Sequence, residues 1–205
     1  MPKVVDADAR RTELAEAVWR VIVRDGLEGA SVRRVAQEAG LSMGSLRHYF
    51  TSQSDLLSFA LELVGDRIEA RISALAPERD QRLRVQAMVE EMLPLDTERR
   101  AECEVWLAFT ARALVDPSLA GLRANIDMRL RQAFRIMIDR LADAGLRRPS
   151  LDRTTEAERL YALVDGLIVH ALLSPEPAGQ HWVKDIVTAH LGDIAPATDQ
   201  PVSGR

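Results

Sequence analysis

Cysteine, lysine and aromatic side chains are scarce in this chain of 205 residues. Its single cysteine, Cys103, excludes a disulfide within the chain and is typical of a reducing compartment, so we expect a cytoplasmic location. The longest apolar run, residues 160–173, is interrupted by Asp165 and His170 and is too short to span a bilayer. The N-terminal residues lack the apolar core of a signal peptide. We therefore predict no membrane partner.

A large excess of charge of one sign is also lacking, because the formal net charge is only −4. This balance excludes a protein whose whole surface coats nucleic acid. Residues 1–50 hold eight Lys or Arg and seven Asp or Glu, whereas the rest of the chain holds nineteen and twenty-four. The resulting net charges, +1 and −5, predict that any contact with DNA is confined to the N-terminal end.

The patterns that usually accompany catalysis are missing as well. The four histidines, at positions 48, 170, 181 and 190, do not have the spacing of metal ligands. Cys103 has no evident base near it in the sequence, and a lone buried cysteine is usually inert. No glycine-rich phosphate loop is present. We expect no enzymatic activity, no metal site and no cofactor.

Apolar residues recur at helical spacing along most of the chain, and no segment alternates convincingly with a period of two. Capping residues, glycines and prolines mark where the predicted helices begin and end. The sequence therefore predicts an all-α fold of about nine helices, with a flexible arm at residues 1–9 and a flexible tail at 193–205. The predicted helices span 10–26, 31–39, 42–50, 54–75, 81–93, 97–115, 118–144, 154–173 and 179–191.

The most informative segment is residues 31–50, which read SVRRVAQEAGLSMGSLRHYF. Ser31 and Ser42 are each placed to cap a short helix, because a serine hydroxyl accepts from a backbone N–H two or three residues on. Gly40 suits the position after the first helix, where a positive φ is usual. Two short helices joined by a tight turn predict a helix-turn-helix, whose second helix enters the major groove of DNA.

The predicted second helix has one apolar and one polar side. Leu46 and Phe50 form the apolar side, which leaves residues 43–45, Arg47 and His48 exposed. Small residues allow a close approach to DNA, and both Arg and His can donate to base edges. Arg47 is the best candidate for base recognition, because a guanidinium binds guanine O6 and N7 in bidentate fashion.

Residues 10–60 resemble the DNA-binding domain of TetR-family transcriptional regulators. The resemblance follows DGL at 25–27, GAS at 29–31, VA at 35–36, AGLS at 39–42, GSL at 44–46, HYF at 48–50 and LL at 56–57, in that order. It implies a three-helix DNA-binding head at residues 1–53. The DNA-contacting residues that it implies are Ser31, Arg33, Arg34, Ser42, Met43, Gly44, Ser45, Arg47, His48, Tyr49 and Gln53.

Three of these assignments have alternatives. Arg34 is by default a solvated charge on a helix. Tyr49 could equally be a core aromatic residue with a solvated hydroxyl. Gln53 stands where the family usually has a lysine that contacts a phosphate, and a glutamine can still donate a neutral hydrogen bond there.

Residues 93–122 and 163–174 resemble the regulatory domain of the choline-responsive BetI group. The resemblance implies a helical body at 54–192 that binds a ligand and forms a dimer. A choline-like cation is usually held by an aromatic cage. This chain has Thr110 and Ile168 at two positions where that group carries tryptophan, so the resemblance does not assign choline as its ligand.

A helical body that senses a ligand needs an apolar cavity. Methionine and aromatic residues at helical spacing are candidates for its lining, with an ordinary core as the alternative. Trp106 is the best single candidate. The predicted pocket residues are Met88, Met92, Cys103, Trp106, Phe109, Phe134 and Met137.

The last two long helices are the predicted dimer surface, because apolar residues cover so much of the first that it should be buried on more than one side. Gly166 would allow close approach of a partner helix. The alternative is that these residues are buried within one chain. The predicted interface residues are Leu160, Leu163, Leu167, His170, Trp182, Ile186 and His190.

These features together predict a dimeric transcriptional regulator. We expect a repressor that binds a palindromic site on double-stranded DNA and is released by an unidentified small molecule. Two alternatives remain open. One is a DNA-bound interaction protein without a ligand, and the other is a helical enzyme that keeps a vestigial head.

Overall fold

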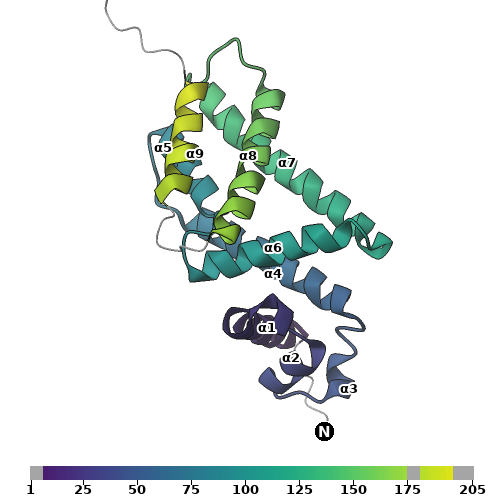
Figure 1. Ribbon diagram of the computed structural model, residues 1–205. Helices are drawn as coiled ribbons and strands as arrows, with labels where there is room; N and C mark the ends of the chain where they lie inside the picture. Colours follow the sequence, from purple (N-terminus) through teal and green to yellow (C-terminus); the bar gives the residue numbers. More distant parts are fainter. Residues whose placement is uncertain (1–6, 175–180, 196–205) are drawn as a thin grey trace, which may run out of the picture. The chain divides into compact units, whose positions relative to one another are not determined.

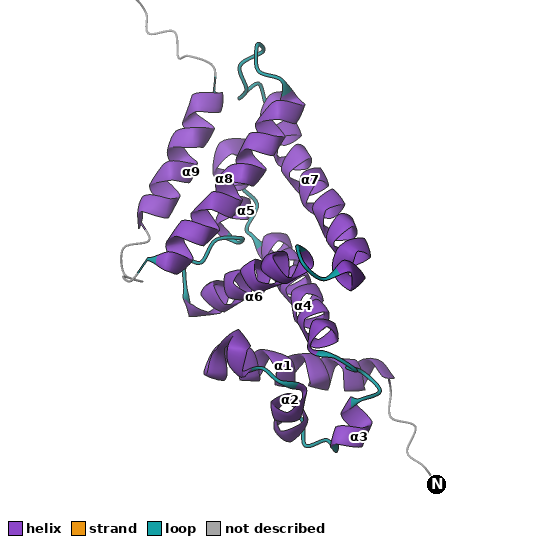
Figure 2. Ribbon diagram, turned by 45° about the vertical axis from the view of Figure 1, so that its right-hand side comes forward, coloured by secondary structure: helices purple, strands orange, loops and turns teal. Residues whose placement is uncertain are grey.

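The computed structural model describes residues 7–174 and 181–195, and within these ranges every regular element is a helix (Figures 1 and 2). This confirms the predicted all-α fold. The elements are α1 (Ala7–Gly29), α2 (Val32–Glu38), α3 (Met43–Leu46), α4 (Gln53–Ala74), α5 (Gln81–Glu90), α6 (Thr97–Ala113), the 3-10 helix η1 (Pro117–Leu119), α7 (Ala120–Asp143), α8 (Arg153–Leu173) and α9 (His181–Ile194).

The chain divides into two compact units. The first comprises Met1–Ser73 and Pro94–Ala124, and the second comprises Ala74–Leu93 and Asn125–Arg205. The first unit therefore contains α6 and η1 together with the helices of the predicted head. The predicted domain boundary at residue 53 does not coincide with the boundary between the units, and it stays a prediction about function.

Helix α1 forms the centre of the head. One apolar side of the helix is buried, with Val18 and Val21 fully inaccessible to solvent. The helix begins at Ala7, so residues 7–9 of the predicted arm are helical, while residues 1–6 lie outside the described range. The predicted stop at Gly26 is a break within the segment, since Gly26 has φ 71° and ψ 170°. A left-handed φ of this kind favours glycine.

Helix α4 begins one residue earlier than predicted, and Ser52 caps it. The hydroxyl of Ser52 accepts from the backbone N–H of Asp55 at 3.1 Å. The Asp55 carboxylate in turn accepts from the backbone N–H of Ser52 at 3.0 Å. This reciprocal pair is a capping box, with aspartate in the position usually held by glutamate or glutamine.

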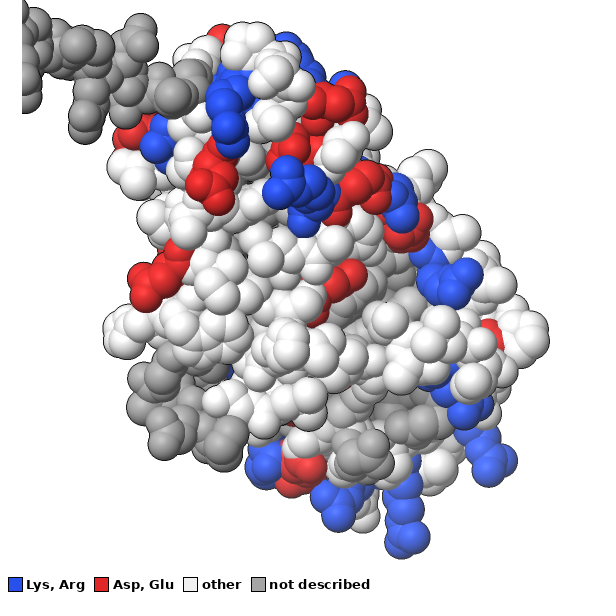
Figure 3. All heavy atoms as spheres, turned by 45° about the horizontal axis from the view of Figure 1, so that its top comes forward, with Lys and Arg blue, Asp and Glu red and all other residues white. Residues whose placement is uncertain are grey.

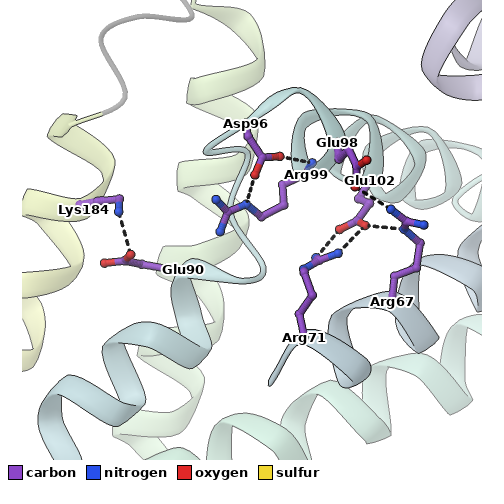
Figure 4. Close-up of polar contacts among 8 residues, drawn as sticks. All are labelled: Arg67, Arg71, Glu90, Asp96, Glu98, Arg99, Glu102 and Lys184. Atoms are coloured by element: carbon purple, nitrogen blue, oxygen red, sulfur yellow. Dashed lines mark hydrogen bonds and ion pairs between the residues drawn. The ribbon is translucent and has the colours of Figure 1, made fainter. Parts of the chain in front are cut away.

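A buried cluster of charges joins α4 to α6 within the first unit (Figure 4). The side chain of Glu102 is only 3% exposed. It accepts from Arg71 through both oxygens, at 2.8 and 2.6 Å, and from Nε of Arg67 at 3.0 Å. The Arg67 guanidinium also lies 4.4 Å from the ring centroid of Trp19 on α1. Arg67 thus contacts both α1 and α6.

The second unit contains α5, α8, α9 and most of α7, with α7, α8 and α9 side by side in both ribbon views (Figures 1 and 2). Phe134 of α7 stacks on Tyr161 of α8 with 5.1 Å between ring centroids. Helix α5 packs against α9, where Nζ of Lys184 lies 2.9 Å from a carboxylate oxygen of Glu90 (Figure 4). Basic and acidic side chains alternate over part of the surface in Figure 3, as expected for a solvated helical face.

Several boundaries in the later part of the chain differ from the predicted ones. A 3-10 turn occupies Pro117–Leu119 before α7 begins, and α5 ends at Glu90 rather than near residue 93. The last helix continues to Ile194, beyond the predicted end at 191. Residues 179–180 and most of the predicted tail lie outside the described residues. No helix in the described part of the chain is both long and apolar enough to cross a bilayer.

Candidate nucleic-acid interface

The first helix of the predicted motif is α2, and its cap is the predicted one. The Ser31 hydroxyl accepts from the backbone N–H of Arg34 at 3.3 Å. Val35 and Ala36 are buried, which holds the helix against the rest of the head. Gly40 has φ 63°, so the positive φ expected after this helix is present.

The second helix, α3, is shorter than predicted. The Ser42 hydroxyl accepts from the backbone N–H of Ser45 at 3.1 Å, which confirms the cap. Regular α-helix ends at Leu46, and residues 47–49 continue as turns rather than as helix to residue 50. The N–H of Phe50 still donates to the carbonyl of Leu46 at 3.0 Å, so the helical path is only slightly loosened.

The segment Ser42–Tyr49, here called the recognition segment, has the predicted two sides. Leu46 is completely buried, and Phe50 just after the segment is 2% exposed. Phe50 also packs edge-on against Phe59 of α4, with 5.2 Å between ring centroids. Burial of Leu46 and Phe50 therefore fixes the inward side of the segment against the rest of the head. The exposed residues are Ser42, Met43, Gly44, Ser45, Arg47, His48 and Tyr49.

Exposure also decides between the two interpretations of Tyr49. The side chain is 45% exposed, which excludes the alternative of a core aromatic residue. The predicted contact of Tyr49 with DNA stays a prediction. The side chain of Gln53, by contrast, lies outside the described part of the structure.

Ion pairs join α1 to α2 and hold Arg34. Asp25 accepts from Nη1 of Arg34 at 2.9 Å, while Glu38 accepts from Arg20 at 2.8 Å and from Arg24 at 2.7 Å. The hydrogen bond from Arg24 lowers the pKa of Asp25, and those from Arg20 and then Arg24 lower the pKa of Glu38. Both carboxylates are therefore ionised at neutral pH, and they orient α2 on α1.

The arginines of the motif differ in what holds them. Arg34 is paired with Asp25, so a contact with DNA would have to compete with that carboxylate. Arg33 and Arg47 are exposed, and neither makes an ion pair with another side chain in the described part of the chain. An exposed guanidinium without a competing carboxylate is the better donor to a phosphate or a base edge.

The predicted pocket residues are divided between the two units. Cys103, Trp106 and Phe109 belong to α6 in the first unit, and the other four lie in the second. Phe109 is 1% exposed, and burial raises the pKa of the Cys103 thiol well above its usual range. The assignment of these residues to a pocket stays a prediction. The four in the second unit are Met88 and Met92, which are half-buried, and Phe134 and Met137, which are buried.

The predicted dimer residues all lie on α8 and α9 of the second unit. Leu160 and Leu167 are already buried within the chain, at 0% and 3% exposure. His170 and Ile186 are exposed, whereas Leu163, Trp182 and His190 are half-buried. The surface available to a second copy is therefore narrower than the predicted set.

Sequence reasoning missed the polar residues that fix the head. Ser52 and Asp55 had a local signal, because a serine three residues before an acidic residue is a capping-box pattern. The contacts between α1 and α2 had none, since the Arg34 partner of Asp25 and the two arginine partners of Glu38 lie on the other helix. No group of His, Cys, Asp or Glu among the described residues is placed to hold a metal ion.

A short capped helix that is held by a buried apolar side and exposes Arg47 and His48 defines a helix-turn-helix DNA-binding protein. Residues 14–58 match the family described as bacterial regulatory proteins, tetR family, and residues 81–196 match BetI-type transcriptional repressor, C-terminal. The chain is 42% identical to the HTH-type transcriptional regulator PksA of Bacillus subtilis (strain 168) over 95% of this chain and 94% of that one. The protein belongs to the TetR family of transcriptional regulators.

Two solved structures with bound ligands are also similar to this chain. One is a putative transcriptional regulator from Saccharomonospora viridis in complex with choline, with 29% identity, a TM-score of 0.68 and coverage of 92% of this chain and 95% of that one. The other is the multidrug binding protein EbrR complexed with ethidium, with 26% identity, a TM-score of 0.63 and coverage of 91% and 99%.

Proposed function

We propose that this regulator is a cytoplasmic, homodimeric repressor that binds a palindromic operator and is released by a small-molecule effector. The observation that supports it best is the recognition segment, which is exposed along Ser42–Tyr49 and anchored by the buried Leu46. The anchored side fixes its orientation, and the exposed side leaves donors free for base edges. Two copies related by a two-fold axis would place two such segments on a palindromic site.

Selection from random duplexes followed by a gel shift tests the DNA-binding step. We expect a selected palindrome to be retained, with an affinity that falls steeply as salt rises. Arg47→Ala should weaken binding by about 10- to 100-fold and relax base preference at one position of each half-site, as expected for loss of a bidentate base contact. Arg140→Ala is the matched control, because it removes the same exposed charge from α7. A chain that ignores every duplex at low salt would refute the proposal.

The dimer surface of the proposal lies on α8 and α9. Leu173 is 74% exposed and Ile186 is 39% exposed. A Cβ at Gly166 would meet nothing within 4 Å, so this turn of α8 has room for a closely packed partner helix. Ile186→Asp should shift the protein towards monomer in light scattering coupled to size exclusion and weaken operator binding in parallel. Dimers that persist in this variant would place the interface elsewhere.

The effector is proposed to be a small organic molecule, and organic cations are the first class to test. Relatives bind choline in one structure and ethidium in another, and both are organic cations. In this chain the Tyr161 ring is covered by Phe134 on one side and lies 5.8 Å from the Arg131 guanidinium, so it is not free to cage a cation. Release of the selected operator by ethidium, with choline as a comparison, tests the class. Failure of a wider metabolite screen would favour a regulator without an effector.

A further inference from the structure

Within the first unit, helix α4 is joined at two points to α6 and to the segment that follows α6. At one, the Ser54 hydroxyl donates to Oδ2 of Asp116 at 2.9 Å. At the other, Arg67 and Arg71 bind the buried Glu102 (Figure 4). The residues pair in opposite chain order. On α4 the two points are separated by roughly 20 to 25 Å, since Ser54 precedes Arg67 and Arg71 by 13 and 17 residues and the rise is 1.5 Å per residue. The start of α4, beside the recognition segment, is therefore tied to the segment that follows α6.

The Asp116 carboxylate is saturated with hydrogen bonds. Its Oδ1 accepts from the hydroxyl of Ser118 at 2.6 Å and from the backbone N–H of Ser118 at 3.1 Å. Its Oδ2 accepts from Ser54 and from Nε of Arg112 at 3.2 Å. Four acceptor positions are about as many as a carboxylate offers. The hydroxyls of Ser118 and then Ser54 lower the pKa of Asp116 to about 2, so it is ionised at neutral pH.

Ser54 belongs to a first turn that is itself fixed. The Asp55 carboxylate accepts from the hydroxyl of Thr51 at 2.6 Å and from its backbone N–H at 2.9 Å. The same carboxylate accepts from the N–H of Ser52, whose hydroxyl accepts from the N–H of Asp55. A displacement of Ser54 therefore carries Thr51 and Ser52 with it.

The capped turn continues directly into the recognition segment. Phe50 precedes Thr51, is buried against Phe59 of α4 and donates its N–H to the carbonyl of Leu46. Each step from Asp116 to Leu46 is thus a hydrogen bond, a buried ring contact or the backbone between two neighbouring residues. A displacement at Asp116 is therefore transmitted to the recognition segment through residues that are held in place by contacts.

We propose that Asp116 is a positioning residue for DNA binding, and that its hydrogen bond to Ser54 sets the orientation of the recognition segment relative to α6. The inference rests on the proposed operator binding and names a regulatory contact for that site. The Glu102 cluster is buried and held by several charge-assisted hydrogen bonds, so it fixes the later part of α4 on α6. The Ser54–Asp116 contact is a single hydrogen bond from a hydroxyl, so the start of α4 is the part that can separate.

Operator affinity of the full chain tests the proposal, measured by fluorescence anisotropy on the selected duplex. We expect Ser54→Ala to weaken binding by about 10- to 100-fold, the effect of losing one hydrogen bond to a charged group. The double variant Ser54→Ala/Asp116→Ala should be no weaker than Asp116→Ala alone, because both changes break the Ser54–Asp116 contact. The salt dependence of binding should stay unchanged, since no phosphate contact is lost.

Two matched variants separate positioning from folding. Ser118→Ala removes a bond to the same carboxylate without touching α4, so its affinity should stay within about two-fold of the parent. Ser54→Thr keeps the hydroxyl and should bind as the parent does, so its comparison with Ser54→Ala decides the question even if Asp116→Ala does not fold.

The failures of the two proposals are distinguishable. A parent chain that binds no selected duplex refutes the proposed function. A parent that binds, with Ser54→Ala within two-fold of it or with additive losses in the double variant, overturns only the role of Asp116. Equal losses in Ser118→Ala and Ser54→Ala would also overturn it, because the effect would then follow the carboxylate and not its bond to α4.

Discussion

Replacing Glu102 by glutamine should destabilise the first unit more than any other single charge removal on α6. The Glu102 side chain is 3% exposed and accepts three hydrogen bonds from two arginines. Loss of one partner from a fully buried ion pair costs about 3–5 kcal/mol. Arg67 and Arg71 are each 29% exposed, so water can solvate part of the freed charge. We therefore expect the free energy of unfolding to fall by about 2 kcal/mol.

The matched control is Glu98→Gln on the same helix. Glu98 also pairs with Arg67, at 2.8 Å, but its side chain is 64% exposed. An exposed pair of this kind contributes less than about 0.5 kcal/mol once solvent screening is included. Urea unfolding of the two variants, followed by circular dichroism, measures the difference. A second readout is the emission of Trp19, whose ring faces Arg67.

The outcome depends on burial and not on charge alone, which makes it easy to refute. Equal losses in Glu102→Gln and Glu98→Gln would show that the cluster is solvated in solution. A loss in Glu102→Gln of less than about 0.5 kcal/mol would show that neither arginine depends on it. Adding Arg71→Met to Glu102→Gln should recover little of the lost free energy of unfolding, because Arg67 would still lack its buried partner.

Further outcomes follow from single positions. Gly40→Ala should lower the free energy of unfolding by about 1 kcal/mol in thermal unfolding, because φ is 63° there although nothing lies within 4 Å of the added Cβ. Gly65→Ala lies in the interior of α4 and is equally uncrowded, so it should instead stabilise the fold by up to about 1 kcal/mol. Asp25→Asn frees Arg34, so the plot of log affinity against log salt should steepen by up to about one unit, and an unchanged slope would show that Arg34 does not reach a phosphate. Burial lowers the pKa of His190 below 6.5, so the unfolded chain binds more protons than the folded one as the pH falls through this range. The free energy of unfolding should therefore fall as the pH drops from about 7 towards 5. His190→Gln should remove this part of the pH dependence in urea titrations.

The elements predicted correctly are those specified by neighbouring residues. Ser31 and Ser42 each cap a helix within three residues, and Gly40 adopts its positive φ regardless of what lies farther away. The apolar spacing of α1 likewise depends on positions three and four apart. The exposed side of the recognition segment followed from the same local spacing, since Leu46 had to face inward.

The features that could not be predicted depend on contacts between distant residues. The Ser54 hydroxyl bonds to Asp116, sixty-two positions away, and nothing near Ser54 in the sequence indicates this partner. Nothing near Arg34 in the sequence indicates that Asp25 holds it. The length of α3 was overestimated because Arg47 and His48 are compatible with a helix, while the chain turns there to bury Phe50.

The distribution of free and paired arginines explains how a chain with a net charge of −4 can still bind DNA. Pairing on α1 cancels much of the positive charge of the head, since Arg20 and Arg24 share Glu38. Among the described basic residues of the head, Arg33 on α2 and Arg47 in the recognition segment make no ion pair. Fewer free charges lower the nonspecific affinity, because that affinity grows with the number of phosphates neutralised. We therefore expect a larger share of the affinity to come from base contacts, with Arg47 and the anchoring of its segment determining the specificity ratio for the operator.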